Sequence, residues 1–136
     1  AYANGGHCPP YIIDAASDAP PRMLDKLSGP LVGVMPDMEY TLFTDTLREQ
    51  ETCLIFTDGV TEAMNSDKEL YGEARLRDFM AAHRGAPPRE LLTLIFSELV
   101  RFRGEEPQSD DITMLAFCRT RNTRVAQPAP TARTSS

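Results

Sequence analysis

Residues 53–63 read "CLIFTDGVTEA", and this stretch decides the fold class. Thr52 to Phe56 is almost entirely apolar and rich in β-prone residues, which predicts a strand covered on both faces. The run stops at Thr57-Asp58-Gly59. A carboxylate is therefore expected at the end of a buried strand. The glycine that follows is expected to let the chain turn tightly and to leave room for water and a substrate.

Downstream of Gly59 the apolar spacing changes to that of helices. Residues 72–83 place Leu76, Phe79 and Met80 on one helical face. Pro88 and Glu90 suit the start of a second helix. The second helix carries a broad apolar stripe: Leu91, Leu92, Ile95, Phe96, Leu99 and Phe102. A stripe of that width predicts packing on a sheet.

Further extended segments lie on either side of these elements. Residues 1–4 and 11–15 are interpreted as a hairpin-like pair of strands. Three more strands are expected at 23–27, at 40–47 with a bulge, and at 112–118, whereas 31–35 is apolar but interrupted by Gly33. Strands come first, then two helices, then a strand, which predicts an α+β fold rather than alternating βαβ units.

Composition excludes several classes of function. The net charge is −6 and no basic stripe with interleaved aromatics occurs, which argues against nucleic-acid binding. Three cysteines, Cys8, Cys53 and Cys118, are interpreted as reduced thiols of a cytoplasmic protein. His7 and His83 are the only histidines, too few for a zinc site. No apolar run reaches membrane-spanning length, so no membrane contact is expected in this segment.

Three carboxylates stand at predicted strand ends. Asp58 closes one apolar strand, and Asp110 and Asp111 open the last one. If these strands are antiparallel neighbours, the carboxylates converge at one edge of the sheet. Their repulsion is relieved by a hard cation, and oxygen ligands suit Mg²⁺ or Mn²⁺. The alternative is that Asp-Gly is an ordinary turn and that Ser-Asp-Asp merely begins a strand.

Five motifs in order resemble the PPM-type metal-dependent protein phosphatases, in particular the branch like stage II sporulation protein E that acts in partner-switching control of sigma factors. The resemblance covers Ala1 to about Arg119. The motifs are "NGGHCPP" (4–10), "SGPLVGV" (28–34), "LIFTDGVTEAMN" (54–65), "ELYGEARL" (69–76) and "SDDITML" (109–115).

The resemblance implies a β-sandwich flanked by helices. It also implies two Mg²⁺ or Mn²⁺ ions that activate a water for attack on phosphoserine or phosphothreonine. Asp58 and Asp110 match the family's metal-ligand positions. Supporting roles are implied for Thr57, Gly59, Glu62, Asp111 and Thr113. Where the family has Asn-Ala-Gly-His this chain has Asn4-Gly5-Gly6-His7, and His7 is interpreted as structural rather than as an acid catalyst. Residues 30–33 carry one residue more than the family's Pro-Leu-Gly.

The resemblance also implies a metal-bridging Asp-Gly pair in an N-terminal half, which is not within residues 1–136 and is expected upstream of Ala1. Residues 1–121 are therefore expected to be the C-terminal part of the phosphatase domain, inactive alone, with a sensor or receiver domain upstream. Residues 122–136, rich in Pro, Ala, Thr and Ser, are expected to form a disordered tail. The implied substrate is a phosphorylated STAS-domain anti-anti-sigma factor. Two alternatives remain: a non-catalytic phosphatase-like module that binds a protein, and a plain interaction domain without metal.

Overall fold

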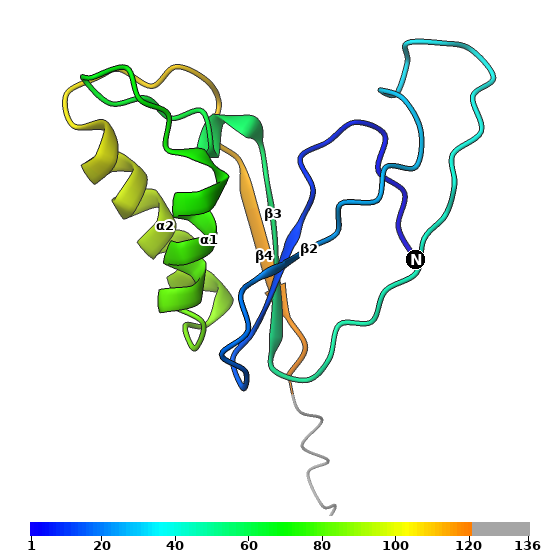
Figure 1. Ribbon diagram of the computed structural model, residues 1–136, viewed down its shortest axis with the longest axis horizontal. Helices are drawn as coiled ribbons and strands as arrows, with labels where there is room; N and C mark the ends of the chain where they lie inside the picture. The colour runs from blue at the N-terminus through cyan, green and yellow to red at the C-terminus, as the bar shows by residue number, and fades with distance from the viewer. Residues whose placement is uncertain (121–136) are drawn as a thin grey trace, which may run out of the picture.

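A computed structural model describes residues 1–120, so the tail expected from residue 122 lies outside the described part. The strands are β1 (Tyr11–Asp14), β2 (Arg22–Met23), β3 (Glu51–Phe56) and β4 (Met114–Cys118). A short 3₁₀ turn, η1 (Asp58–Val60), follows β3, and the helices are α1 (Gly72–Ala82) and α2 (Pro88–Arg103). The strands form one antiparallel sheet in the order β2-β1-β3-β4, and both helices cover the same face of it (Figure 1).

Strand β3 is the centre of the sheet, as its apolar sequence predicts. Five of its six residues are buried, because β1 and β4 flank it and the helices cover one face. The register pairs Phe56 with Met114 and Thr52 with Cys118. The antiparallel arrangement on which the carboxylate argument depends is therefore confirmed. The end of β3 lies beside the start of β4.

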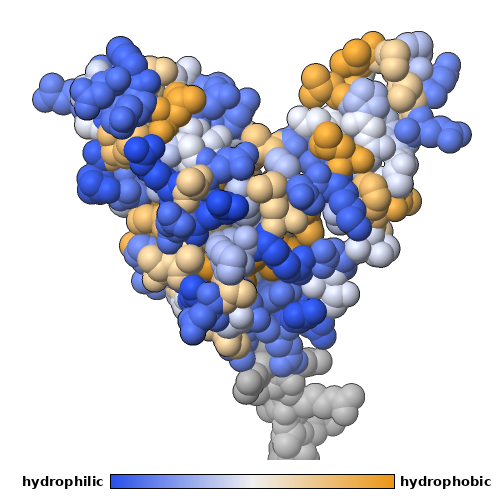
Figure 2. Space-filling model, in the orientation of Figure 1, coloured by the Kyte–Doolittle hydropathy of each residue, from blue (hydrophilic) through white to orange (hydrophobic). Residues whose placement is uncertain are grey.

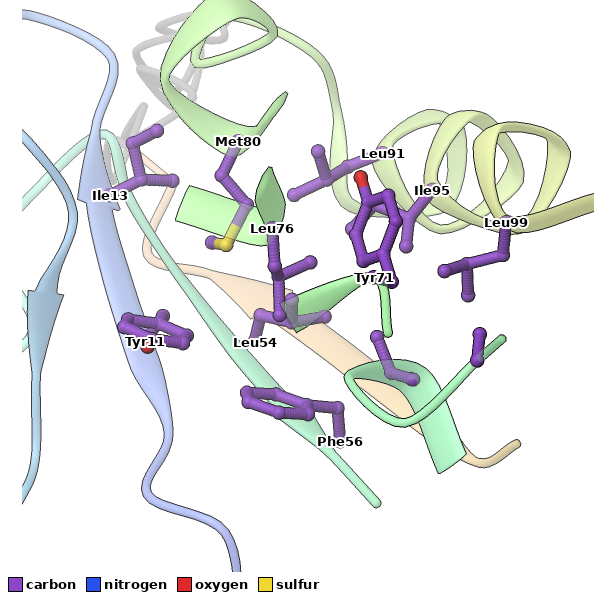
Figure 3. Close-up of a cluster of buried hydrophobic side chains, with 12 residues drawn as sticks. Tyr11, Ile13, Leu54, Phe56, Tyr71, Leu76, Met80, Leu91, Ile95 and Leu99 are labelled. Atoms are coloured by element: carbon purple, nitrogen blue, oxygen red, sulfur yellow. The ribbon is translucent and has the colours of Figure 1, made fainter. Parts of the chain in front are cut away.

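The core lies between the sheet and the two helices (Figure 3). Helix α1 contributes Leu76 and Met80, and α2 contributes Leu91, Ile95 and Leu99, each set at a spacing of four residues. The four sheet residues in this cluster are Tyr11, Ile13, Leu54 and Phe56. The stripe on α2 is narrower than predicted, since Phe96 is 49% exposed.

The other face of the sheet carries apolar side chains that residues 1–120 cover only in part, since Ile12 and Cys53 are buried. Along β4, Met114 and Ala116 pack on the core, whereas Leu115 and Phe117 are exposed. A hollow of about 320 Å³ lies on this side, lined in part by Cys53, Ile55 and Phe117. The described residues thus supply one sheet and one helical layer of the expected sandwich.

Three expected strand arrangements differ from the structure. Residues 1–4 and β1 do not form a hairpin-like pair. Tyr2 forms a bridge with Phe43, while β1 pairs with β2 and β3. Residues 40–47 contain only that one bridge instead of a bulged strand, because no second strand within residues 1–120 offers its backbone along the segment. The strand expected at 23–27 is likewise reduced to Arg22–Met23.

Residues 24–47, which we call the arm, leave the sheet as an irregular excursion (Figure 1). Orange side chains gather on it in the space-filling view (Figure 2), and Val32 is 76% exposed. At its base Arg22 bonds Asp45 at 2.8 Å, and Ser28 donates its N–H to Asn4. None of the helices in the described residues has the length and apolar character needed to cross a membrane.

Candidate metal centre

Thr57 joins the two segments that carry the predicted carboxylates through three hydrogen bonds, which we call the clasp. Its main-chain N–H donates to the Thr113 carbonyl at 3.0 Å. Its hydroxyl donates to the Asp111 carbonyl at 2.9 Å and accepts the Thr113 N–H at 3.0 Å. Because these bonds lie just beyond the last strand pair, Phe56 with Met114, they extend the ladder to the edge of the sheet. Sequence reasoning gives Thr57 and Thr113 only unspecified supporting roles.

Asp58 follows directly and begins η1. Its main-chain carbonyl accepts the N–H of Glu62 at 2.8 Å and the hydroxyl of Thr61 at 3.1 Å. Its carboxylate Oδ1 accepts the N–H of Gly59 at 3.1 Å. The side chain is exposed. The turn therefore anchors the backbone of Asp58 and leaves most of the carboxylate's acceptor capacity open toward solvent.

Gly59 is required here for a reason other than the expected tight turn. A Cβ at this position would lie 2.6 Å from the Asp111 carbonyl oxygen and 3.0 Å from its carbonyl carbon. The Gly59 backbone has no left-handed conformation. Because Gly59 has no side chain, the turn after β3 packs directly against the main chain of Asp111.

Asp110 and Asp111 are both exposed at the start of the β4 segment. The Asp110 carboxylate accepts the N–H of Asp111 at 2.7 Å, and the Asp110 carbonyl accepts the Gln108 amide at 2.7 Å. The structure thus brings the Asp111 main chain against Thr57 and Gly59. The role of Asp58 and Asp110 as metal ligands stays a prediction.

A loop that sequence reasoning treats as structural forms the other wall of the site. A cavity of about 120 Å³ is lined by Gly6, His7 and Cys8 on one side and by Thr57 and Asp58 on the other. The loop comes from the segment before β1, and the turn comes from the end of β3. The motifs "NGGH" and "TDG", about 50 positions apart, therefore share one cavity.

The electrostatic environment of this cavity is acidic. Burial raises the pKa of the Cys8 thiol, and the charges of Asp58, Glu73 and Glu62 raise it further. Glu73, in the first turn of α1, also accepts the hydroxyl of Tyr11 at 3.3 Å. Sequence reasoning missed Glu73, although an acid directly after Gly72 at a helix start is a visible signal. Three carboxylates, two from the turn that follows β3 and one from α1, therefore act on one thiol.

The donor set fits a hard cation in kind but is too small in number. Asp58 and Asp110 offer carboxylate oxygens, which suit Mg²⁺ or Mn²⁺. Within residues 1–120, however, no group of three or more His, Cys, Asp or Glu side chains is arranged to hold a metal ion. Asp58 and Asp110 are thus the residues that would contribute to a metal site, and further ligands would be needed to complete it.

Comparison with known proteins finds a matching family and similar proteins. A family model described as stage II sporulation protein E matches residues 1–120. Protein IcfG of Synechocystis sp. is 36% identical over 119 residues, which are 88% of this chain and 18% of that protein.

Two solved structures are similar. The SiaA-PP2C domain of Pseudomonas aeruginosa has a TM-score of 0.68 at 23% identity, covering 82% of this chain and 42% of that one. The RsbU and RsbW domains of Rv1364c from Mycobacterium tuberculosis have a TM-score of 0.67 at 26% identity, covering 85% and 31%. The chain therefore spans less than half of each of these relatives.

Proposed function

The chain belongs to the stage II sporulation protein E family, and from this membership we propose that it is the C-terminal part of a metal-dependent phosphoserine/phosphothreonine protein phosphatase. The observation that carries the proposal is the junction at Thr57–Gly59. There the family's "TDG" and "DDIT" motifs are joined by three hydrogen bonds and a direct backbone contact. A plain interaction domain would have no need for exposed aspartates held at such a junction.

In this proposal Asp58 and Asp110 hold Mg²⁺ or Mn²⁺. Bound divalent ions supply a water of lowered pKa and neutralise charge on the phosphoryl oxygens. The chain's own contribution is positional. Thr57 and Gly59 hold the two segments together, and Asp111, through its carbonyl, is the point where they meet. Glu62 adds negative charge beside the cavity, which attracts the cations.

We infer that the missing ligands come from sequence upstream of residue 1. The chain spans 42% of the SiaA-PP2C domain, so a complete domain is about twice as long. A carboxylate from that upstream half would complete the ligand set. Since two cations at close range repel, residues 1–136 alone should hold metal weakly and turn over slowly.

The same reasoning extends to the signalling context. One similar structure is named for its RsbU and RsbW domains, and this likeness supports a place in partner switching. The proposed substrate is a phosphorylated STAS-domain anti-anti-sigma factor in the cytoplasm. A sensor or receiver domain in the same polypeptide would control the phosphatase.

The test is metal-dependent phosphate release from a phosphorylated protein by the full-length polypeptide that carries this chain. Asp58→Asn and Asp110→Asn should each abolish most turnover with Mn²⁺. Asp78→Asn is the matched control, because Asp78 is an exposed aspartate on α1 away from the junction. Full activity in both site variants would refute the assignment. Robust activity of residues 1–136 alone would refute the need for upstream ligands.

The second candidate is a non-catalytic module that binds a protein partner. The exposed apolar arm favours it, because contiguous apolar surface marks interaction sites. Its signature would be partner binding by the full-length protein without any phosphate release, unchanged by Asp58→Asn.

A further inference from the structure

The loop that faces Asp58 is held rigidly by one buried side chain. Asn4 is 6% exposed, and its Oδ1 accepts the N–H groups of Gly6 at 3.0 Å and His7 at 2.8 Å. Its Nδ2 donates to the His7 carbonyl at 2.9 Å, and its main-chain N–H donates to the Ser28 hydroxyl at 2.7 Å. Both polar groups of the amide are thus used to lock the main chain around His7.

The His7 ring is oriented by a further contact. Its Nδ1 lies 3.0 Å from the Cys8 carbonyl oxygen, which can only accept, so Nδ1 carries the hydrogen. Nε2 is then the ring atom available to a ligand. The side chain is exposed and lines the cavity that it shares with Thr57 and Asp58. A fixed loop that places this ring nitrogen at the same cavity as Asp58, a proposed metal ligand, exceeds what a structural histidine requires.

His83 shows what a structural histidine looks like in the same chain. Its Nδ1 also lies close to a carbonyl, that of Phe79 at 2.8 Å. Its ring stacks on Phe79 with the centroids 4.2 Å apart, at the end of α1. The two histidines therefore share the Nδ1 contact and differ in surroundings: His83 packs on its own helix, whereas His7 borders the acidic cavity.

We propose that His7 contacts the phosphoryl group of the substrate through Nε2 and that Asn4 is the residue that positions it. The proposal rests on the phosphatase function proposed above and assigns that site one more substrate-binding residue. Phosphate oxygens are acceptors, so a phosphomonoester in the cavity would select the imidazolium form of His7, in which Nε2–H donates while Nδ1–H keeps the Cys8 carbonyl. The carboxylates of Asp58 and Glu62 repel a phosphate. A cationic donor on the opposite wall would offset that repulsion.

The test uses His7→Ala and His7→Gln in the full-length protein, with His83→Gln as the matched control. His7→Ala should raise the KM for a phosphoserine peptide and weaken inhibition by inorganic phosphate about tenfold, the effect of one hydrogen bond to a charged group. His7→Gln should recover part of this loss, because its amide N–H takes the place of Nε2–H. His83→Gln should behave like the parent. Asn4→Ala, which frees the loop, should reproduce the KM effect with His7 intact.

A second measurement does not depend on turnover. With inorganic phosphate and Mg²⁺ present, the imidazole NMR signals of His7 should shift and those of His83 should not. Unchanged KM and phosphate inhibition in His7→Ala, with an unmoved His7 signal, would overturn the proposal while leaving the phosphatase function standing. No phosphate release by the parent protein would overturn the function instead, and the His7 signal would then decide whether the cavity takes phosphate at all. Thermal unfolding of each variant checks that the replacement at the exposed His7 leaves the protein folded.

Discussion

At the scale of single residues, the packing of the site requires a position without a side chain. Gly59 is a glycine because the Asp111 backbone occupies the space of a side chain. Tyr71 shows the opposite case in the core, since it is 1% exposed and its hydroxyl has no hydrogen-bond partner. Both residues lie in motifs of the family resemblance, but for physically different reasons.

Gly59→Ala should destabilise the protein by about 1–3 kcal/mol, because the new Cβ would lie 2.6 Å from the Asp111 carbonyl oxygen and force the two backbones apart. It should also weaken Mn²⁺ binding by displacing Asp58 relative to Asp110. Urea unfolding and metal titration measure the two effects. Gly85→Ala is the control, since a Cβ there meets nothing within 4 Å. Equal stability of the two variants would contradict the close approach.

Tyr71→Phe should leave stability unchanged or raise it by up to about 1 kcal/mol, because it removes a buried hydroxyl without a partner. Tyr11→Phe should instead cost about 0.5–1.5 kcal/mol, because the Tyr11 hydroxyl bonds Glu73. Denaturant midpoints of the two variants compare these cases directly. A clear loss of stability in Tyr71→Phe would show that the hydroxyl has a partner in solution.

At the scale of elements, the meeting of β3 and β4 positions the chemistry. Their hydrogen-bonded register ends at Phe56 and Met114, and Thr57 extends it by side-chain bonds to the Asp111–Thr113 segment. The sequence predicts both strands and their polar ends. It does not predict the clasp, because a threonine at a strand end carries no signal of which backbone its hydroxyl will bond.

Thr57→Val keeps the shape of the side chain and removes both hydroxyl bonds. We expect a loss of about 1–2 kcal/mol of stability and weaker Mn²⁺ binding, since the Asp110–Asp111 segment loses its attachment to the Asp58 turn. Thr93→Val serves as the comparison, because its hydroxyl bonds only the Arg89 carbonyl within α2. If both variants bind Mn²⁺ like the parent, the clasp does not position the site.

At the scale of the whole molecule, the burial of two tyrosines in the core makes the free energy of unfolding depend on pH in the alkaline range. Desolvation is the largest cause that raises the pKa of Tyr11 and of Tyr71 to about 12, from an ordinary value of 10.0. In the folded state both therefore hold their protons more tightly than in the unfolded chain. Their contribution to stability is fully present below pH 10 and is lost as the pH rises toward 12.

We accordingly expect the free energy of unfolding to fall between about pH 10 and pH 12, by up to roughly 1.4 kcal/mol per pH unit for each tyrosine. Denaturant unfolding followed by circular dichroism at a series of pH values measures the slope. The double variant Tyr11→Phe, Tyr71→Phe should flatten it. A slope equal to that of the parent would mean that other groups control alkaline unfolding.

The sequence by itself determined the strand at β3, both helices, the α+β class and the family, because apolar periodicity and short motifs are local properties of the chain. Only the tertiary structure decided three contacts. Gly59 packs directly against the Asp111 backbone, and Tyr2 bridges Phe43 instead of pairing with β1. His7 lines the same cavity as Asp58. The physical reason is that these features join segments about 40 to 50 positions apart. Such contacts are set by how the sheet brings strand ends together, and no local pattern encodes which distant backbone will be the neighbour.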